Sequence, residues 1–418
     1  MAILFVATEV DAQGQGDSPP ATPKPRAVWK TRGEVFTLAF YPDGKTLAAG
    51  IGRIDKARVL GHKALGSPWG DFPGEIEVWD VANGKRVLLI EGDTPNGGLA
   101  FAPDGKHLIG CGGVYRKDET DFRNPKVGII KVWDARNGKE MAEFAQSRIV
   151  TSLSFSPTAP LMATGCFDSK VTLWDMKSGT TAAVLKGHDK IVHTVVFSPD
   201  GKMLASGGYD EIIRLWNVAT KELVAELNDP GPVGPGKSVD CLAFSPDGER
   251  LAAGTDQGVK IWDVPNRKRL RHIEGGWSTS LSFSANGQRL AWTDSEMQCV
   301  RWTDVATGKD EAKFAGHEKR IAGMAISPDG KTLATGSEDQ TIRLWDLESW
   351  SLSLKDEGTS CQSSAVENPN FQSYFLQPQV MLRYCPPSVH SHPGSIHASF
   401  WRHRPCVDSL AWFSRLSP

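Results

Sequence analysis

The stretch 316–346, GHEKRIAGMAISPDGKTLATGSEDQTIRLWD, decides the fold of this chain. It begins with Gly-His, ends with Trp-Asp, and contains three runs typical of β-strands, at 321–327, 332–336 and 341–345. Between the first two runs lies Pro328-Asp329-Gly330, in which proline fixes φ and glycine accepts a positive φ, so a tight hairpin turn is expected. The third run is rich in β-branched and aromatic residues, as strands are. Such a three-stranded antiparallel meander is too small to bury both its faces, so it requires neighbours.

Comparable units precede this one along the chain. Each ends in a tryptophan, at intervals of roughly 40–45 residues apart from a longer first interval. These tryptophans are Trp79, Trp133, Trp174, Trp216, Trp262, Trp302 and Trp345. Aspartate follows five of them, and Asn217 and Thr303 take its place in the other two. The Pro-Asp-Gly turn recurs in five units and is degraded at 157–159 and 285–287.

The regular spacing of these Pro-Asp-Gly turns and Trp-Asp ends resembles the WD-repeat β-propeller family. The resemblance covers residues 26–349 and implies an all-β fold, a seven-bladed β-propeller of four-stranded antiparallel blades in one domain. Residues 1–25 are expected to be a disordered leader or linker, and residues 350–418 an irregular, disordered tail. The resemblance is specific for the fold and says little about function, because one fold serves many functions.

The family resemblance also implies how the ring closes. The sequence repeat is offset from the blade, so one terminus supplies the outer strand of the last blade and protects its edge. We expect residues 27–31 to fill this place, paired with 341–345. Residues 350–354 compete for the same place, because they follow the last Trp-Asp directly.

The two ends of the chain each leave alternatives open. Residues 1–7 are apolar but lack a positively charged region before them, so a truncated signal peptide and a frayed leader both fit. Residues 13–25 form a Gly/Pro/polar linker. In the tail the periodicity is lost, and its cysteines and histidines match no zinc-binding spacing. The tail is interpreted either as native disordered sequence or as translation out of the ancestral frame.

Composition restricts the partners. With 47 Lys+Arg against 49 Asp+Glu, the net charge is −2, which gives no electrostatic case for nucleic acid or an anionic membrane. No apolar run approaches the ~20 residues that span a bilayer, so no membrane insertion is expected. We expect a monomeric ring. Cys111, Cys166 and Cys241 fall on strands as small buried residues and form no disulfide framework, which favours the cytoplasm. Export is the alternative if the leader is a truncated signal peptide.

In this family, a histidine, a Ser or Thr, an aspartate and the tryptophan of one unit form a hydrogen-bonded structural network. The resemblance therefore implies two complete sets: His188, Ser206, Asp210 and Trp216 in the fourth unit, and His317, Thr335, Asp339 and Trp345 in the seventh. The third unit keeps Thr164, Asp168 and Trp174 without a histidine. The remaining units are more degraded, so their blades are expected to rely on apolar packing.

Signatures of catalysis are not found. The sequence contains no G-x-S-x-G, G-x-x-x-x-G-K-[ST] or H-E-x-x-H motif. The Asp, His and Ser sets are assigned to the structural network. No catalytic residue, cofactor or metal site is therefore predicted, and the protein is not expected to be an enzyme.

One face of the ring is expected to carry the elaborated loops. Connections between second and third strands, and connections leading into first strands, emerge together on it. Long excursions at 52–74 and 114–126 and a Pro/Gly-rich loop at 229–236 all project from this face, which we call the loop-rich face. Partner-binding residues are predicted on it by alignment of the units: Phe36, Phe167, Ile191, His193, Tyr209, Trp277, Arg320 and Glu338. Aromatic residues and arginine are enriched in interface hot spots.

Two functions follow as hypotheses. The favoured one is a non-catalytic scaffold that binds an unidentified partner protein or peptide on the loop-rich face. The alternative is a propeller enzyme or small-ligand binder with its site at the central channel, which requires convergent acids, histidines or a metal at the axis. The partner and the pathway are not encoded in any motif.

Overall fold

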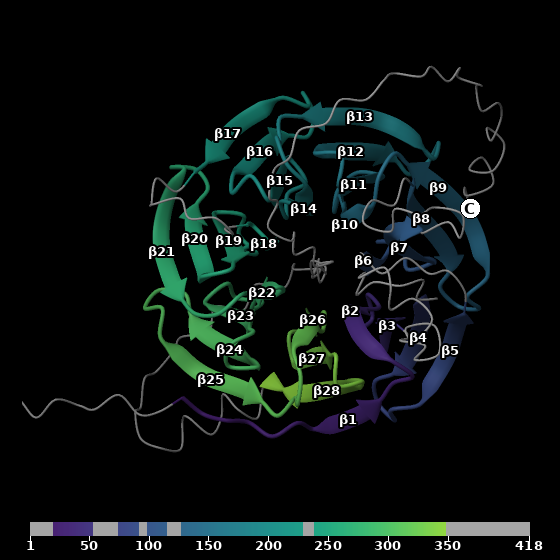
Figure 1. Ribbon diagram of the computed structural model, residues 1–418, viewed down its shortest axis with the longest axis vertical. Coiled ribbons are helices and arrows are strands. Elements are labelled where there is room, and N and C mark those ends of the chain that lie inside the picture. Colours follow the sequence, from purple (N-terminus) through teal and green to yellow (C-terminus); the bar gives the residue numbers. More distant parts are fainter. Residues whose placement is uncertain (1–19, 53–73, 92–97, 115–126, 229–237, 348–418) are drawn as a thin grey trace, which may run out of the picture.

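The structure is a computed structural model that describes residues 20–52, 74–91, 98–114, 127–228 and 238–347. In these residues 28 strands form seven four-stranded antiparallel sheets arranged in a ring (Figure 1). The seven-bladed propeller expected from the repeats is therefore confirmed. In the described residues no helix is long and apolar enough to cross a membrane. Three features considered from the sequence lie outside the described residues. They are the competing segment 350–354, the cysteines and histidines of the tail, and the three elaborated loops.

Blades are numbered in chain order. Blade 1 consists of β2 (Glu34–Phe40), β3 (Thr46–Gly52), β4 (Gly74–Asp80) and β5 (Arg86–Glu91). Blade 2 consists of β6 (Gly98–Phe101), β7 (His107–Val114), β8 (Val127–Asp134) and β9 (Glu140–Gln146). Blade 3 consists of β10 (Val150–Phe155), β11 (Leu161–Cys166), β12 (Lys170–Asp175) and β13 (Thr180–Lys186).

The second half of the ring follows the same order. Blade 4 consists of β14 (Val192–Phe197), β15 (Met203–Gly208), β16 (Ile213–Asn217) and β17 (Leu223–Leu227). Blade 5 consists of β18 (Cys241–Phe244), β19 (Arg250–Thr255), β20 (Gly258–Asp263) and β21 (Lys268–Glu274). Blade 6 consists of β22 (Leu281–Phe283), β23 (Arg289–Asp294), β24 (Cys299–Asp304) and β25 (Asp310–Ala315). Blade 7 consists of β26 (Ile321–Ile326), β27 (Thr332–Ser337), β28 (Thr341–Asp346) and β1 (Ala27–Lys30).

The N-terminal strand closes the ring. β1 pairs antiparallel with β28, with Ala27 opposite Leu344 and Lys30 opposite Thr341. The Trp29 indole is buried in the core between blades 7 and 1 and stacks on Trp79 at a ring-centroid distance of 5.4 Å. The expectation that residues 27–31 supply the outer strand is thereby confirmed. Figure 1 shows β1 lying along β28 at the outer rim of the ring.

The segment before β1 differs from the expected free linker. Ala21 forms a parallel bridge with Ala312 of β25, and its backbone N–H donates to Glu311 O at 3.0 Å. Lys313 N–H donates in turn to Ala21 O at 2.8 Å. The leader therefore attaches to the rim of blade 6 before it reaches blade 7. A single bridge has no periodicity, so the sequence carried no signal for it.

A serine completes the Pro-Asp-Gly turn of blade 7. Gly330 adopts a φ of 72°, as the turn requires. The hydroxyl of Ser327 accepts from Thr332 N–H at 2.9 Å, and Asp329 Oδ1 accepts from Lys331 N–H at 3.0 Å. The turn is consequently held by side chains as well as by proline and glycine.

The apolar core is divided among the seven blade-to-blade junctions. Seven clusters of buried apolar residues are present in the described part of the chain, and each spans two neighbouring blades. Each contains one indole that faces the preceding blade. These indoles belong to Trp79, Trp133, Trp174, Trp216, Trp262, Trp292 and Trp345. The ring thus depends on every junction.

Trp302 was wrongly identified as the repeat tryptophan of blade 6. In blade 4, Leu204 pairs with Trp216, whereas the equivalent Leu290 of blade 6 pairs with Thr303. The register therefore differs by one residue from the expected one. A shift of one residue along a strand moves a side chain to the opposite face. Trp302 accordingly packs in the cluster between blades 6 and 7, where its ring lies 6.3 Å from that of Phe314.

Trp292, on the preceding strand β23, supplies the indole at the junction between blades 5 and 6. It is fully buried, and its indole N–H donates to Thr303 Oγ1 at 2.9 Å. Asp304, rather than Thr303, stands where the aspartate of Trp-Asp is expected, and its Oδ1 accepts from Thr307 N–H in the following turn. In blade 6 the tryptophan and the hydroxyl residue have exchanged strands, and the hydrogen bond between them is kept.

The closing strand gives the first prediction. Trp29→Ala should lower the free energy of unfolding by about 3–5 kcal/mol, because it opens a cavity in the junction between blades 7 and 1. Val28→Ala in the same strand should change it by about 0.5 kcal/mol or less, since Val28 is 49% exposed. Chemical denaturation of both variants measures the difference. Equal stability of the two variants would contradict the closing role of β1.

Candidate functional site

The predicted partner-binding residues lie where first strands begin and second strands end. In blade 4 the backbone N–H of Tyr209 donates to Ile191 O at 3.0 Å, and in blade 7 that of Glu338 donates to Arg320 O at 3.0 Å. In blade 3, Phe167 N–H donates to Ile149 O at 2.9 Å. In each of these blades the bond links the entry to the first strand with the residue after the second strand. The two positions predicted from the alignment therefore lie side by side.

A bulge sits at the start of several first strands. The register shifts between Val35 and Thr37 in blade 1, so Phe36 is the extra residue, and His193 is the extra residue in blade 4. Bulges turn a side chain away from the regular alternation of a strand. The alignment of the units selected Phe36 and His193 at this position, but it did not reveal the bulge.

Three of the predicted residues form a contiguous cluster across blades 6 and 7. The Arg320 guanidinium lies 6.0 Å from the centroid of the Trp277 ring, and Arg320 Nε donates to Glu338 Oε1 at 2.8 Å. All three side chains are partly exposed. An arginine over an indole face is a favourable electrostatic contact. The cluster therefore presents an aromatic ring held in place by an ion pair.

Asp240 extends this cluster into blade 5 and was missed from the sequence. The Trp277 indole N–H donates to Asp240, whose Oδ1 also accepts from Ser238 Oγ at 2.6 Å. Asp240 is 1% exposed, so the partly exposed Trp277 ring is anchored to a buried carboxylate. Asp240 occupies the aligned position of Phe36 and His193, but its contact with the Trp277 ring arises from the packing of blade 5 against blade 6, which the sequence does not show.

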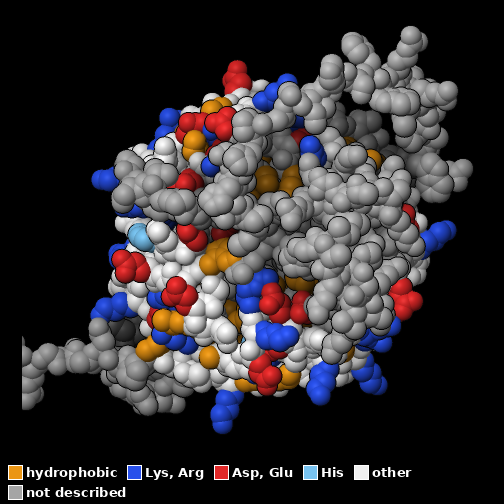
Figure 2. Space-filling model, viewed as in Figure 1, with side chains coloured by type: hydrophobic (Ala, Val, Ile, Leu, Met, Phe, Trp, Pro, Cys, Tyr) orange, Lys and Arg blue, Asp and Glu red, His pale blue; other side chains and the backbone are white. Residues whose placement is uncertain are grey.

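Glu34 adds charge at the other side of the cluster. Burial raises its pKa, and Glu338 raises that pKa further, whereas Lys319 and Arg320 lower it. Figure 2 shows Lys, Arg, Asp and Glu side chains intermixed over β26 and β27 on the face toward the viewer. This part of the surface therefore combines both signs of charge with an aromatic ring.

His193 does not lie on the surface, and its prediction as a contact residue was wrong. It is 1% exposed, and its ring packs edge-on against Tyr209 with the centroids 4.2 Å apart. Burial lowers the pKa of His193 to about 4, so the ring is neutral at neutral pH. Every residue of β14 is buried, which sequence alternation could not reveal. His193 supports the half-buried Tyr209 from beneath.

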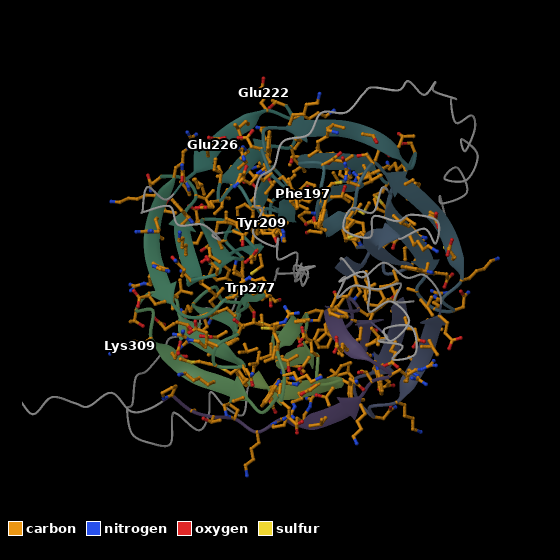
Figure 3. The ribbon with its side chains drawn as sticks, in the orientation of Figure 1. Phe197, Tyr209, Glu222, Glu226, Trp277 and Lys309 are labelled. Atoms are coloured by element: carbon orange, nitrogen blue, oxygen red, sulfur yellow. The ribbon has the colours of Figure 1, made fainter. Side chains whose placement is uncertain are left out.

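Figure 3 shows Tyr209 and Trp277 beside the central opening of the ring, whereas Glu222, Glu226 and Lys309 lie at its outer rim. Ile191, Phe36 and Phe167 are also partly exposed. Phe36 lies in blade 1 and Phe167 in blade 3, away from the Trp277 cluster. The structure thus assembles Trp277, Arg320 and Glu338 directly.

The network of blade 4 has the hydrogen bonds that the resemblance implied. His188 Nδ1 lies 2.8 Å from Asp210 Oδ2, His188 Nε2 lies 2.7 Å from Ser206 Oγ, and Trp216 Nε1 donates to Ser206 Oγ at 2.8 Å. With the histidine proton on Nδ1, the ring donates to Asp210 and accepts from Ser206. Burial alone raises the pKa of Asp210, but hydrogen bonds from His188 and Arg214 lower it to about 2.

Blade 7 repeats this arrangement. His317 Nδ1 lies 2.8 Å from Asp339 Oδ2, and His317 Nε2 lies 2.8 Å from Thr335 Oγ1. Trp345 Nε1 donates to Thr335 Oγ1 at 3.0 Å. Burial lowers the pKa of His317, against the opposing effect of Asp339, so the imidazole is held neutral. These residues are engaged with one another inside the blade.

Other blades also carry polar contacts here, and for blades 1 and 6 the expectation that they rely on apolar packing was wrong. In blade 3, Trp174 Nε1 donates to Thr164 Oγ1 at 3.0 Å, and Ser147 Oγ donates to Asp168 Oδ2 at 2.7 Å in place of a histidine. In blade 6, Thr303 Oγ1 also donates to Asp310 Oδ1 at 2.8 Å.

Blade 1 uses charged groups in this position. Glu77 is fully buried, and its Oε1 accepts from Arg86 Nη1 at 2.7 Å. Arg32 Nε lies 3.4 Å from Glu75 Oε2. The Trp79 indole N–H has no partner among the described residues, so blade 1 has ion pairs without the indole hydrogen bond of the other networks.

Within the described ranges no group of three or more His, Cys, Asp or Glu side chains could hold a metal ion. Cys111, Cys166, Cys241 and Cys299 are buried and free. Burial raises the pKa of the Cys299 thiol to about 11, which keeps it protonated. The arrangement of the described side chains is suited to holding blades together and to presenting the Trp277 cluster.

Comparison with known proteins identifies the repeats. A family model described as "IFT122 first beta-propeller" matches residues 164–376, and one described as "WD domain, G-beta repeat" matches residues 138–175. The chain is 26% identical over 324 residues to "Cell division cycle 20.1, cofactor of APC complex" of Arabidopsis thaliana, covering 76% of this chain and 55% of that protein.

Two further relatives match over shorter stretches. The "B-type cell cycle switch protein ccs52B" of Medicago truncatula is 32% identical over 22% of this chain and 19% of its own length. The "Guanine nucleotide-binding protein subunit beta" of Saccharomyces cerevisiae is 36% identical over 18% of this chain and 17% of its own length. The chain therefore spans between about a fifth and about half of the length of these relatives.

The networks give a stability prediction. His317→Ala or Asp339→Ala should lower the free energy of unfolding by about 1–3 kcal/mol, because each leaves buried partners unsatisfied. Lys331→Ala, at the exposed turn of the same blade, should leave it nearly unchanged. Thermal and chemical unfolding provide the comparison. If both network variants unfold as the unmodified protein does, His317 and Asp339 do not form a stabilising network.

Proposed function

This chain belongs to the WD-repeat β-propeller family, and we propose that it acts within that family as a non-catalytic scaffold that binds a partner protein or peptide on its loop-rich face. The observation that carries the proposal is the cluster of Trp277, Arg320 and Glu338 on a closed ring. An aromatic ring and an arginine in contact, partly exposed and fixed by buried Asp240, have the composition of an interface hot spot.

Rigidity supports the same proposal. Each blade is fixed by two junctions, and the ring has no free terminal blade because β1 pairs with β28. A partner therefore meets side chains that are already ordered, and less conformational entropy opposes binding. Tyr209, supported by His193, adds a second aromatic contact in blade 4.

The names of the relatives point in the same direction. One is named as a cofactor of the APC complex and another as a β subunit of a guanine nucleotide-binding protein, and both names describe proteins that work in assemblies with other proteins. A net charge of −2 gives no general attraction to nucleic acid, so the proposed partner is a protein or peptide.

Loop-face variants test the proposal. Tyr209, Trp277 and Arg320 changed together to alanine should weaken partner binding by several kcal/mol, because the truncation removes the centre of the cluster. The partner is first identified by affinity capture with the intact protein, and purified partner is then titrated against each variant. Thermal unfolding must show that the triple variant remains folded.

The matched control lies on the opposite face. Lys45, Lys202 and Lys331 are exposed at Pro-Asp-Gly turns, and their joint change to alanine should cost little affinity. If the turn-face variant loses affinity and the loop-face variant binds normally, the proposed face is wrong. If neither variant changes affinity and the protein turns over a small molecule at the channel, the scaffold function itself is wrong.

A further inference from the structure

The outer strand of blade 5 is the most basic of the seven outer strands. At its start, four cations lie within five residues: Arg267, Lys268, Arg269 and Arg271. The first three are exposed, and Arg271 is partly exposed. In β21 three Lys and Arg stand against one Glu, an excess of two, whereas the excess in each of the other six outer strands is at most one. Positive charge on the rim is therefore concentrated at blade 5.

Nearby carboxylates leave much of this charge uncompensated. Arg271 donates to backbone carbonyls of the neighbouring turn in blade 6, to Thr307 O at 2.8 Å and to Ala306 O. Asp263 lies opposite Lys268, but its Oδ1 accepts from Asn266 N–H at 2.8 Å. Among the described residues neither Arg267 nor Lys268 is in an ion pair. The cations are consequently available to an incoming anionic group.

The neighbouring outer strand shows how a blade edge receives an extended segment. On β25 of blade 6, Glu311 O accepts from Ala21 N–H at 3.0 Å, and Lys313 N–H donates to Ala21 O at 2.8 Å. These two backbone groups flank Ala312, which pairs with Trp302 on its other side. A segment that presents one N–H and one C=O therefore adds to the outer edge of a blade in this ring.

The strand register identifies the same pair of backbone groups on β21. In blade 6 the residue before Ala312 is a bulge without a cross-strand partner. In blade 5, Arg271 pairs with Ile261, and the preceding Leu270 is the bulge. Leu270 C=O and His272 N–H accordingly occupy the places of the two groups that bind Ala21. β21 is the outermost strand of its sheet, and no described segment pairs with its outer edge (Figure 1).

The groups on this edge select an acidic, extended peptide. Arginine and lysine on both sides of Leu270 attract carboxylates, and Leu270, which is 52% exposed, offers an apolar contact between them. The outward C=O of Leu270 requires a donor, which a peptide N–H supplies and a phosphodiester does not. A second copy of β21 is disfavoured, because pairing two such edges would bring like charges together.

We propose that the outer edge of β21, from Arg267 to His272, is a docking site for an acidic extended segment of a partner protein. The segment adds to blade 5 as Ala21 adds to blade 6. We call this surface the basic edge. It lies on the outer rim of the ring (Figure 1). The inference goes beyond the proposed function and does not depend on it, because it concerns a second surface.

A synthetic octapeptide of alternating glutamate and valine is the probe, since it follows the alternation of cations and Leu270. Titrated against the full chain at low ionic strength, it should bind, and its affinity should fall as salt rises because exposed charges are screened. Amide hydrogen exchange should slow in β21 and stay unchanged in β13. The same peptide N-methylated at every residue keeps its charge but has no backbone donors, so it should bind about tenfold more weakly.

Charge reversal on the protein gives the matched comparison. Arg267→Glu with Lys268→Glu should weaken peptide binding by about tenfold, because each change replaces an attraction at an exposed site by a repulsion. Lys177→Glu with Lys186→Glu alters the net charge equally on the exposed rim of blade 3 and should leave the affinity unchanged. Both variants should unfold thermally as the unmodified protein does.

Several results would overturn the docking site. Equal weakening by the two double variants, or equal affinity for the N-methylated peptide, would leave only a general attraction to anions. Tighter binding of a single-stranded DNA octamer or of phosphatidylserine vesicles would assign the edge to another class of ligand. The leader of this chain also carries acids, so Glu9→Gln, Asp11→Asn and Asp17→Asn together should not change peptide affinity. Tighter binding in that variant would make the leader, rather than a partner, the occupant.

The loop-face triple variant separates this inference from the proposed function. With Tyr209, Trp277 and Arg320 changed to alanine, the protein should bind the acidic octapeptide as the unmodified protein does. Loss of peptide binding in that variant would contradict a separate site on the rim. Failure of the octapeptide to bind the unmodified protein would refute the basic edge and leave the test of the loop-rich face unaffected.

Discussion

The antiparallel pairing of β1 with β28 is the constraint on which the rest of the structure depends. An open array of blades would leave one apolar junction uncovered and the sheet edges of blade 7 unprotected. Because the chain returns to complete its last blade with its first strand, all seven junctions are buried, and each carries its own apolar cluster. The bridge of Ala21 to blade 6 extends this closure beyond a single strand. A surface built on such a ring is rigid without any contribution from a partner.

Within that ring, one chemical demand recurs at every described junction. An indole is buried between two blades, and its N–H requires an acceptor. Ser206 and Thr335 meet the demand with the help of histidines, Thr164 meets it beside Gln146, and Thr303 meets it after exchanging strands with the tryptophan. Trp79 and Trp262 leave the demand unmet among the described residues. Departures from the repeat are therefore places where the fold either finds a substitute acceptor or leaves a buried indole N–H unpaired.

Much of this architecture could be predicted from the sequence. The number of blades followed from the repeated motifs, and the closing strand and the networks around His188 and His317 followed from the family resemblance that these motifs carry. The errors came from features without a local signal. Trp302 matched the motif by residue type, but pairing across the sheet sets its register, and the burial of His193 depends on the neighbouring blades. Asp240 was missed because its contact with Trp277 joins two blades.

The central claim is that a partner binds the rigid loop-rich face of the ring. Amide hydrogen exchange of the protein with and without its captured partner tests it most directly. The account predicts slower exchange at the starts of first strands, near Ile191, Asp240 and Arg320, with no change at the turns of Gly201 and Gly330. Protection confined to those turns, or to the outer strands of the blades, would contradict it.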